Sequence, residues 1–170
     1  MLPETINPQI SVLDNDLLQV NLGRWMQQCE LIKSYYSATH VFVLQITQSG
    51  FEVIVSSVSE TPLFTSGTLF PNNFPLFEAL KNSNIDGDYL NLSRFMLDEL
   101  PRDFDGIQYI LSRPIAWPDG SQFGSLCVLN PHMADPLSNS AMLEPFQILL
   151  QQELSLLCQN HRIESLSMRD

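Results

Sequence analysis

Residues 107–130 read IQYILSRPIAWPDGSQFGSLCVLN, in which two apolar runs are joined by Pro118-Asp119-Gly120. Asp-Gly between two apolar runs is among the strongest local signals for a β-hairpin, because Gly accepts positive φ and Asp tolerates it. Both runs are nearly continuous in apolar or small residues and do not alternate cleanly with polar ones. Such runs are typical of central strands that are covered on both faces. The stretch therefore predicts the middle of a sheet with a layer on each side.

A helix and a second hairpin are predicted ahead of this centre. Asp14 offers a capping oxygen, and apolar residues then recur at spacings of three and four as far as about Ser37, which is the pattern of an amphipathic helix. Segments 40–47 and 51–58 are rich in β-branched and aromatic residues and are separated by a turn that contains Gly50. They predict two paired strands.

Residues 60–89 differ in texture, because prolines and asparagines are interleaved there with leucines and phenylalanines. Irregular segments that are this apolar usually lie against a core. We expect one short helix at 76–81 and one short strand at 89–92. Together the patterns predict an α+β fold with a central antiparallel sheet of about five to six strands. The N- and C-terminal helices pack on one face, and loops and short helices cover the other.

The segment from Ser140 onward contains no glycine and predicts a long helix with two apolar lines. The first line, at spacings of three and four, consists of Leu143, Phe146, Leu150, Leu154 and Leu157. The second line repeats every seven residues and consists of Met142, Leu149, Leu156 and Ile163. Two lines give a helix two faces to bury, one on its own domain and one on a partner helix, as in a coiled-coil seam. The alternative is one wide apolar face on an intramolecular helix.

Composition limits the classes of partner. The chain has 170 residues, 44% of them hydrophobic, and a net charge of -11, with 8 lysines and arginines in total. Nucleic acid is excluded as a direct partner, because phosphate binding needs clustered basic residues. No stretch is long and apolar enough to span a membrane, and the N-terminus does not resemble a secretory signal. Three cysteines, an odd number, suit reduced thiols in a cytoplasmic protein.

The hairpin residues carry a resemblance to a known family. Arg113-Pro114-Ile115, Trp117-Pro118-Asp119-Gly120 and the run from Phe123 to Leu129 resemble the central hairpin of GAF domains, small-molecule sensing modules with a GAF/PAS-like fold. The resemblance extends from about Leu17 to Leu157 and is to the type found N-terminal to diguanylate cyclase (GGDEF) or histidine kinase output modules. Asn130 stands where the family commonly has Asp.

The resemblance implies a non-catalytic regulatory domain in bacterial signal transduction. Such a domain binds a small molecule and transmits its state through dimeric terminal helices to an output domain. On this basis residues 1–13 are expected to form an N-terminal arm, residues 14–157 the GAF-like sensor domain, and residues 158–170 the start of a helical linker. The output module would lie outside this chain, and the chain is expected to be a homodimer.

The resemblance also implies a cavity between the sheet and the 60–105 block. The candidate ligand-binding residues are Phe64, Phe70, Phe77, Phe95, Tyr109, Leu111, Arg113, Trp117 and Cys127. This mostly aromatic lining suits a small apolar or planar ligand. Arg113 could clamp an anionic ligand, or it could form a salt bridge to Asp119 or an acidic loop residue. Alternatively, the phenylalanines fill the cavity and the chain is a ligand-free dimerisation module.

Cys127 raises a third possibility, a small redox enzyme of the free methionine sulfoxide reductase type. Those members of the family use paired cysteines, because the sulfenic acid must be resolved by a second thiol. Cys127 lies between apolar neighbours in a predicted strand, which favours a buried structural thiol. We therefore assign no catalytic and no metal-binding residues. A covalent bilin is not expected, since no cysteine lies between Cys29 and Cys127, and haem is not expected because the histidines are poorly placed.

Overall fold

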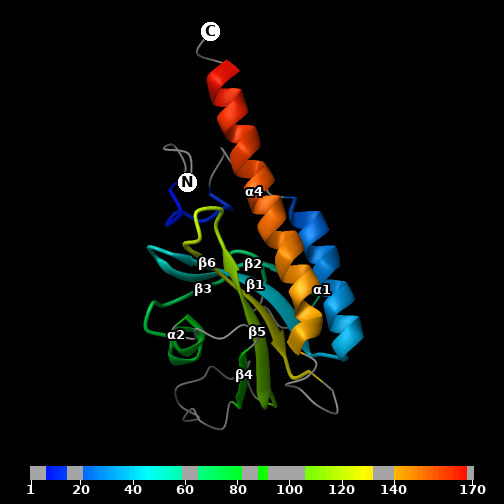
Figure 1. Ribbon diagram of the computed structural model, residues 1–170. Coiled ribbons are helices and arrows are strands. Elements are labelled where there is room, and N and C mark those ends of the chain that lie inside the picture. Colours follow the sequence, from blue (N-terminus) through cyan, green and yellow to red (C-terminus); the bar gives the residue numbers. More distant parts are fainter. Residues whose placement is uncertain are drawn as a thin grey trace.

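The computed structural model describes residues 7–14, 21–58, 65–81, 88–91, 106–131 and 140–167. The elements in chain order are α1 (Leu22–Tyr36), β1 (His40–Thr47), β2 (Gly50–Ser56), β3 (Leu69–Phe70), α2 (Pro75–Lys81), β4 (Asp88–Asn91), β5 (Tyr109–Ala116), β6 (Gln122–Leu129), the 3₁₀ turn η5 (Ser140–Leu143) and α4 (Glu144–Ser167). The strands form one antiparallel sheet of 6 strands in the order β3-β2-β1-β6-β5-β4. Figure 1 shows this sheet between α1 and α4 on one side and α2 on the other. The predicted fold class is confirmed.

The hairpin at the centre of the sequence forms β5 and β6. Its turn is closed by backbone bonds from Trp117 N to Ser121 O at 2.8 Å and from Gly120 N to Trp117 O at 2.9 Å. Gly120 has a φ of 88°, which a residue with a side chain rarely adopts. The Asp119 carboxylate accepts the Ser121 N–H at 2.9 Å, as expected for an aspartate that stabilises a turn. Asp119 is thus used in turn formation.

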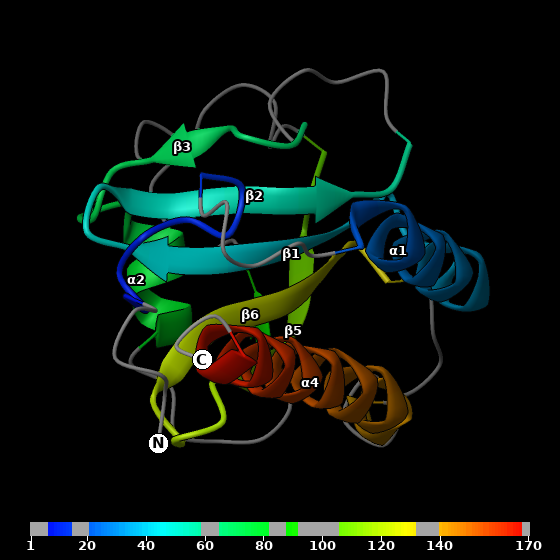
Figure 2. The ribbon, with the colours of Figure 1, turned by 90° about the horizontal axis from the view of Figure 1, so that it is seen from above.

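The helix-covered face carries the larger core. Trp25, Cys29, Ile32 and Tyr36 of α1 are all buried at spacings of three and four, and α1 contacts β1 and β2 while α4 contacts β5. Figure 2 shows α1 and α4 running close to each other on this side of the sheet. The described helix begins at Leu22, because the side chain of Asn21 caps it by accepting the Arg24 N–H at 3.0 Å. The predicted start just after Asp14 falls on residues 15–20, outside the described residues.

Helix α4 buries the first of its predicted lines. Leu143, Leu150 and Leu154 are at most 1% exposed, and Phe146 and Leu157 pack against the same core. The second line is exposed where it is described, at 46% for Met142, 48% for Leu149 and 57% for Leu156. The helix continues without a break to Ser167 and extends past the sheet in Figure 1. No helix among the described residues is long and apolar enough to cross a membrane.

The N-terminal segment is tied to the sheet by a buried amide. Gln45 of β1 is fully buried; its Oε1 accepts the Val12 N–H at 2.8 Å, and its Nε2 donates to Ile10 O at 2.9 Å. Both halves of the amide are therefore satisfied by backbone of residues 7–14. Val12 completes the packing as a member of the helix-face core.

Candidate functional site

The two faces of the sheet separate the residues that the sequence grouped into one pocket. Phe70, Phe77 and Cys127 belong to the core on the face that α2 covers. Leu111 and Trp117 belong to the opposite core, against α1 and α4. Their assignment to one cavity with Phe77 was wrong, because neighbouring residues of a strand point to opposite faces. The candidates Phe64 and Phe95 lie outside the described residues.

Arg113 also lies on the helix side, since its Nη1 donates to Gln147 Oε1 of α4 at 3.2 Å. It is 7% exposed. The predicted alternative of a salt bridge to Asp119 is wrong, because Asp119 is an exposed turn residue whose carboxylate bonds to Ser121. Tyr109, half-buried at the start of β5, is an even number of residues from Leu111 and Arg113 and so shares their side of the strand. Neither Arg113 nor Tyr109 is placed with Phe77.

The face beneath α2 is filled by phenylalanines. Phe77 of α2 is their centre, with ring centroids 4.8 Å from Phe70, 4.9 Å from Phe74, 5.7 Å from Phe51 and 6.1 Å from Phe42. The interplanar angles of these pairs, 60° to 89°, are edge-to-face arrangements that aromatic rings favour. All five rings are at most 6% exposed. We call these five residues the aromatic cluster.

The space beside the aromatic cluster is small. A cavity of about 10 Å³ lies there, which is room for about one water molecule. Its lining residues are Leu44, Ile46, Phe51, Phe77, Lys81, Gly124 and Ser125. The half of this face formed by β1, β2, β3 and α2 therefore holds no ligand-sized cavity among the described residues. The other half of this face includes Ile110, Cys127 and Leu129.

A larger cavity, of about 170 Å³, lies at a different place, between the N-terminal segment and the β1–β2 turn. Its lining residues are Gln9, Ile10, Ser11, Asp14, Thr47, Gln48, Ser49, Glu52, Gly67 and Leu69. Burial and the nearby Asp14 raise the pKa of Glu52, against the effect of a hydrogen bond from Ser11. The sequence analysis did not single out this polar cavity.

The chemistry of the cysteines is that of buried thiols. Cys127 is fully buried in the same core as the aromatic cluster, and burial raises the pKa of its thiol far above the usual range. Burial likewise raises the pKa of Cys29 to about 12 and raises the pKa of Cys158. Cys29 and Cys158 belong to the helix-face core and Cys127 to the opposite core, so the sheet separates them. Within the described residues no group of histidine, cysteine and acidic side chains could hold a metal ion.

Helix α4 makes polar contacts with the outer edge of β5 that the sequence analysis missed. Among the described residues, strand β4 pairs with β5 as far as Ser112. Beyond it, Gln147 Nε2 donates to Pro114 O at 2.6 Å, and Gln151 Oε1 accepts the Ala116 N–H at 2.9 Å. Two glutamines one helical turn apart thus take the place of a neighbouring strand. In the sequence, these contacts are indicated only by the spacing of four residues between Gln147 and Gln151, next to the buried apolar line of the helix.

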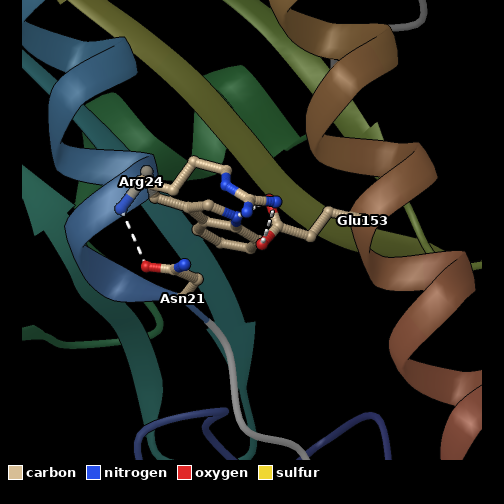
Figure 3. Close-up of polar contacts among 4 residues, drawn as sticks. Asn21, Arg24 and Glu153 are labelled. Atoms are coloured by element: carbon tan, nitrogen blue, oxygen red, sulfur yellow. Dashed lines mark hydrogen bonds and ion pairs between the residues drawn. The ribbon is translucent and has the colours of Figure 1, made fainter.

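A second tie joins α4 to α1. Glu153 of α4 accepts the indole N–H of Trp25 at 2.6 Å through Oε2, and its Oε1 lies 3.9 Å from Arg24 Nη1. Figure 3 shows Arg24 and Asn21 at the start of α1, with Glu153 reaching toward them from α4. The side chain of Arg24 is 62% exposed, so its ion pair contributes little compared with the shorter indole bond. The position of α4 is therefore fixed by polar contacts to both β5 and α1.

Comparisons with known proteins identify the fold. No protein-family model and no curated protein matches the chain. Among solved structures, the GAF domain of a two-component sensor histidine kinase from Bacillus halodurans superposes with a TM-score of 0.63 at 12% identity, over 82% of this chain and 97% of that one. The phycocyanobilin-bound GAF domain of a cyanobacterial phytochrome gives 0.57 at 14% identity, over 84% and 87%. A type II free methionine-R-sulfoxide reductase from Thermoplasma acidophilum gives 0.61 at 13% identity, over 80% and 93%.

These similarities establish the class. The chain has the fold of GAF domains, as the hairpin motif predicted. At these identities the likeness is one of fold, which sensor domains and a reductase share.

Proposed function

We propose that this chain is a non-catalytic regulatory domain that binds a small molecule and transmits its state through a dimer of its terminal helices. The observation that carries the proposal is the exposed line of Met142 in η5 and Leu149 and Leu156 on α4. A seven-residue repeat of exposed apolar side chains is what a partner helix requires, and the domain's own core leaves it uncovered. Helix α4 also continues to Ser167, in the direction in which an output module would follow.

The ligand would lie on the face opposite α4, in the half beside the aromatic cluster. The described wall of that half consists of Ile110, Cys127 and Leu129, all buried and uncharged. Such a wall suits a small apolar or planar molecule. We expect no covalent bilin, because the three thiols are buried in the two cores.

Native mass spectrometry of freshly purified protein tests both parts of this proposal. The expected spectrum contains a dimer that carries a small molecule, which is released when the same sample is denatured. Sedimentation velocity at several protein concentrations gives an independent measure of the dimer. A protein that is monomeric at all concentrations would contradict the transmission mechanism.

The aromatic cluster favours a second candidate function, a ligand-free dimerisation module. Five interlocked rings already fill the α2 half of the face without a ligand. In this case native mass spectrometry detects a dimer whose mass equals that of two polypeptides. The two candidates share the dimer and differ only in the bound molecule.

The burial of the three thiols does not favour a free methionine sulfoxide reductase. Turnover needs a thiolate and a second thiol that resolves the sulfenic acid. Burial keeps Cys127 protonated, and Cys29 and Cys158 lie beyond the sheet. We expect no reduction of free methionine sulfoxide, measured as substrate consumed in the presence of a dithiol reductant. Activity that Cys127→Ser abolishes would establish the enzyme instead.

A further inference from the structure

Arg113 is a charged side chain inside the helix-face layer, and the regulatory proposal does not use it. It lies in β5, opposite Leu126 of β6, and is 7% exposed. Its Nη1 donates to Gln147 Oε1 at 3.2 Å, while its Nε is shut off from solvent and has no acceptor. The side chain is thus more than nine-tenths buried with one donor unpaired.

The charge of Arg113 lacks a counter-ion in the described part of the chain. Its partner Gln147 is neutral, and the amide nitrogen of Gln147 is already used on Pro114 O. No Asp or Glu oxygen of the described residues lies within ion-pair distance of the guanidinium. The ion pair found among the described residues joins Arg24, at the start of α1, to Glu153. A buried charge without a counter-charge is costly, and an anion that paired with the guanidinium would remove that cost.

The edge of the guanidinium that carries the unpaired Nε selects the shape of that anion. On this edge Nε and Nη2 present two parallel N–H groups, spaced to meet two oxygens of a carboxylate or a phosphate. Gln147 lies in the first turn of α4, which follows η5 directly and carries the acidic Glu144, so the guanidinium itself is the positive charge at this position. Burial raises the pKa of the Tyr36 phenol to about 12. Arg113 is close enough to this phenol to act in the opposite direction and lower the pKa.

We propose that Arg113 is the centre of an oxyanion-binding site between β5 and the first turn of α4. The ligand class is a small carboxylate or phosphate that binds side-on to Nε and Nη2. The site lies on the helix-covered face, across the sheet from the ligand position of the regulatory proposal, and does not depend on it. Because Nη1 of the same guanidinium holds Gln147, a bound oxyanion fixes the residue that ties α4 to Pro114.

Thermal unfolding of the full chain with sodium phosphate or sodium acetate, against sodium chloride at equal ionic strength, tests the site. At about fifty times the dissociation constant, the midpoint is expected to rise by about 5–9 °C above the chloride reference. A rise in the phosphate arm identifies a tetrahedral ligand, and a rise in the acetate arm identifies a carboxylate. Equal midpoints in all three salts overturn the proposal.

Two variants separate this site from general anion effects. Arg113→Met removes the fork, and its midpoint is expected to be the same in the three salts. The matched control Arg24→Met removes an exposed arginine that touches the same helix, and it keeps the full rise. A rise in Arg113→Met equal to that of the unmodified chain overturns the proposal.

A measurement on the unmodified chain covers the case in which Arg113→Met does not fold. The Nε–H resonance of Arg113, assigned through its bonds by NMR, is expected to move downfield and saturate as phosphate or acetate is added. The resonances of exposed arginines serve as internal controls. An Arg113 resonance that moves no more than theirs contradicts binding at this edge.

Discussion

At the scale of single residues, the two central thiols show how burial sets chemistry in this fold. Cys29 and Cys127 lie in the opposite cores, and for both the largest cause of the raised pKa is loss of solvation. In the folded chain both thiols keep their protons at a pH where a solvated thiol loses its own. The thiol group of Cys127 therefore acts as a small apolar side chain.

This difference predicts how stability depends on pH. Above about pH 9 the unfolded chain releases protons that folded Cys29 retains up to about 12, so the folded state binds more protons and the free energy of unfolding falls as pH rises. The loss is at most about 1.4 kcal/mol per pH unit for each buried thiol. Urea denaturation at pH 8, 9 and 10 measures it. Cys29→Ala flattens the dependence, and equal slopes in the two proteins would refute this origin.

Asn130, at the end of the central hairpin, has a role that the structure explains. It has a φ of 55°, its Oδ1 accepts the Gln108 N–H at 2.9 Å, and its Nδ2 donates to Gly106 O at 3.0 Å. An amide can accept from one of these backbone groups and donate to the other, whereas an ionised carboxylate can only accept. Asn130 therefore holds the entry to β5 in place.

We predict that Asn130→Asp is destabilising by about 1 kcal/mol at pH 7, because the bond to Gly106 O is replaced by repulsion between two oxygens. Below about pH 4 the aspartic acid is protonated and can donate again, so the difference from the unmodified chain shrinks. Chemical denaturation of both proteins at pH 7 and pH 3.5 measures this. A deficit that is the same at both pH values would show that the Gly106 contact is not its cause.

The residue patterns predicted where the strands lie in the sequence, but not which face of the sheet each side chain joins. The hairpin from Tyr109 to Leu129 could be predicted, because its turn and its apolar runs are local signals. The face of Leu111 and Trp117 could not, since a strand buried on both sides has no polar alternation to indicate which side chains share a layer. The contacts with α2 and α4 decide which side chains of a strand face which core, and these helices come from distant parts of the chain.

At the scale of elements, the edge of β5 shows how a helix can replace a strand. Pro114 has no N–H and suits an edge position, and its carbonyl is met by Gln147. One turn further, Gln151 accepts the Ala116 N–H. These contacts fix the position of α4 along the strand, whereas its apolar line alone would permit sliding. The apolar lines of α4 could be predicted from spacing, but not the polar ones, because glutamine on a helix is ordinarily a solvated residue.

Gln151 allows a test of one of these contacts. Gln151→Met removes the acceptor and leaves the Ala116 N–H without a partner, which costs about 1–3 kcal/mol. Gln151→Glu retains an acceptor oxygen and is expected to lose less. Amide hydrogen exchange should speed up at Ala116 in the Met variant and stay slow in the Glu variant. Fast exchange in both would mean that the side-chain contact does not protect this edge.

At the scale of the whole molecule, the sheet divides the domain into two cores with different roles. The aromatic cluster under α2 is closed, and the helix layer joins α4 to β5 and to Trp25 of α1. Within the described parts of the chain, the sheet and its edge connect the aromatic side to α4. The class of fold could be predicted from local patterns, but the polar ties of Glu153, Gln147 and Gln45 join segments far apart in sequence and follow from packing.

The exposed apolar line of α4 predicts that two copies of the chain form a dimer. Leu149 and Leu156 are 48% and 57% exposed on the flank of α4 beside Glu153. We expect Leu149→Asp, Leu156→Asp and the double variant to be folded monomers, because a carboxylate in a helix seam is desolvated without a partner. Sedimentation velocity gives the oligomeric state, and circular dichroism checks that the fold is kept.

Met26→Asp is the matched control for these variants. Met26 is 39% exposed on α1 and lies two residues, or about 200° around the helix, from Arg24, which faces α4. It is therefore an exposed apolar residue on the flank of α1 turned away from α4, and Met26→Asp is expected to remain dimeric. If Met26→Asp dissociates as readily as Leu149→Asp, loss of the dimer is not specific to the apolar line of α4. If all the variants stay dimeric, the seven-residue line of α4 is not the interface and signal transmission through it fails with it.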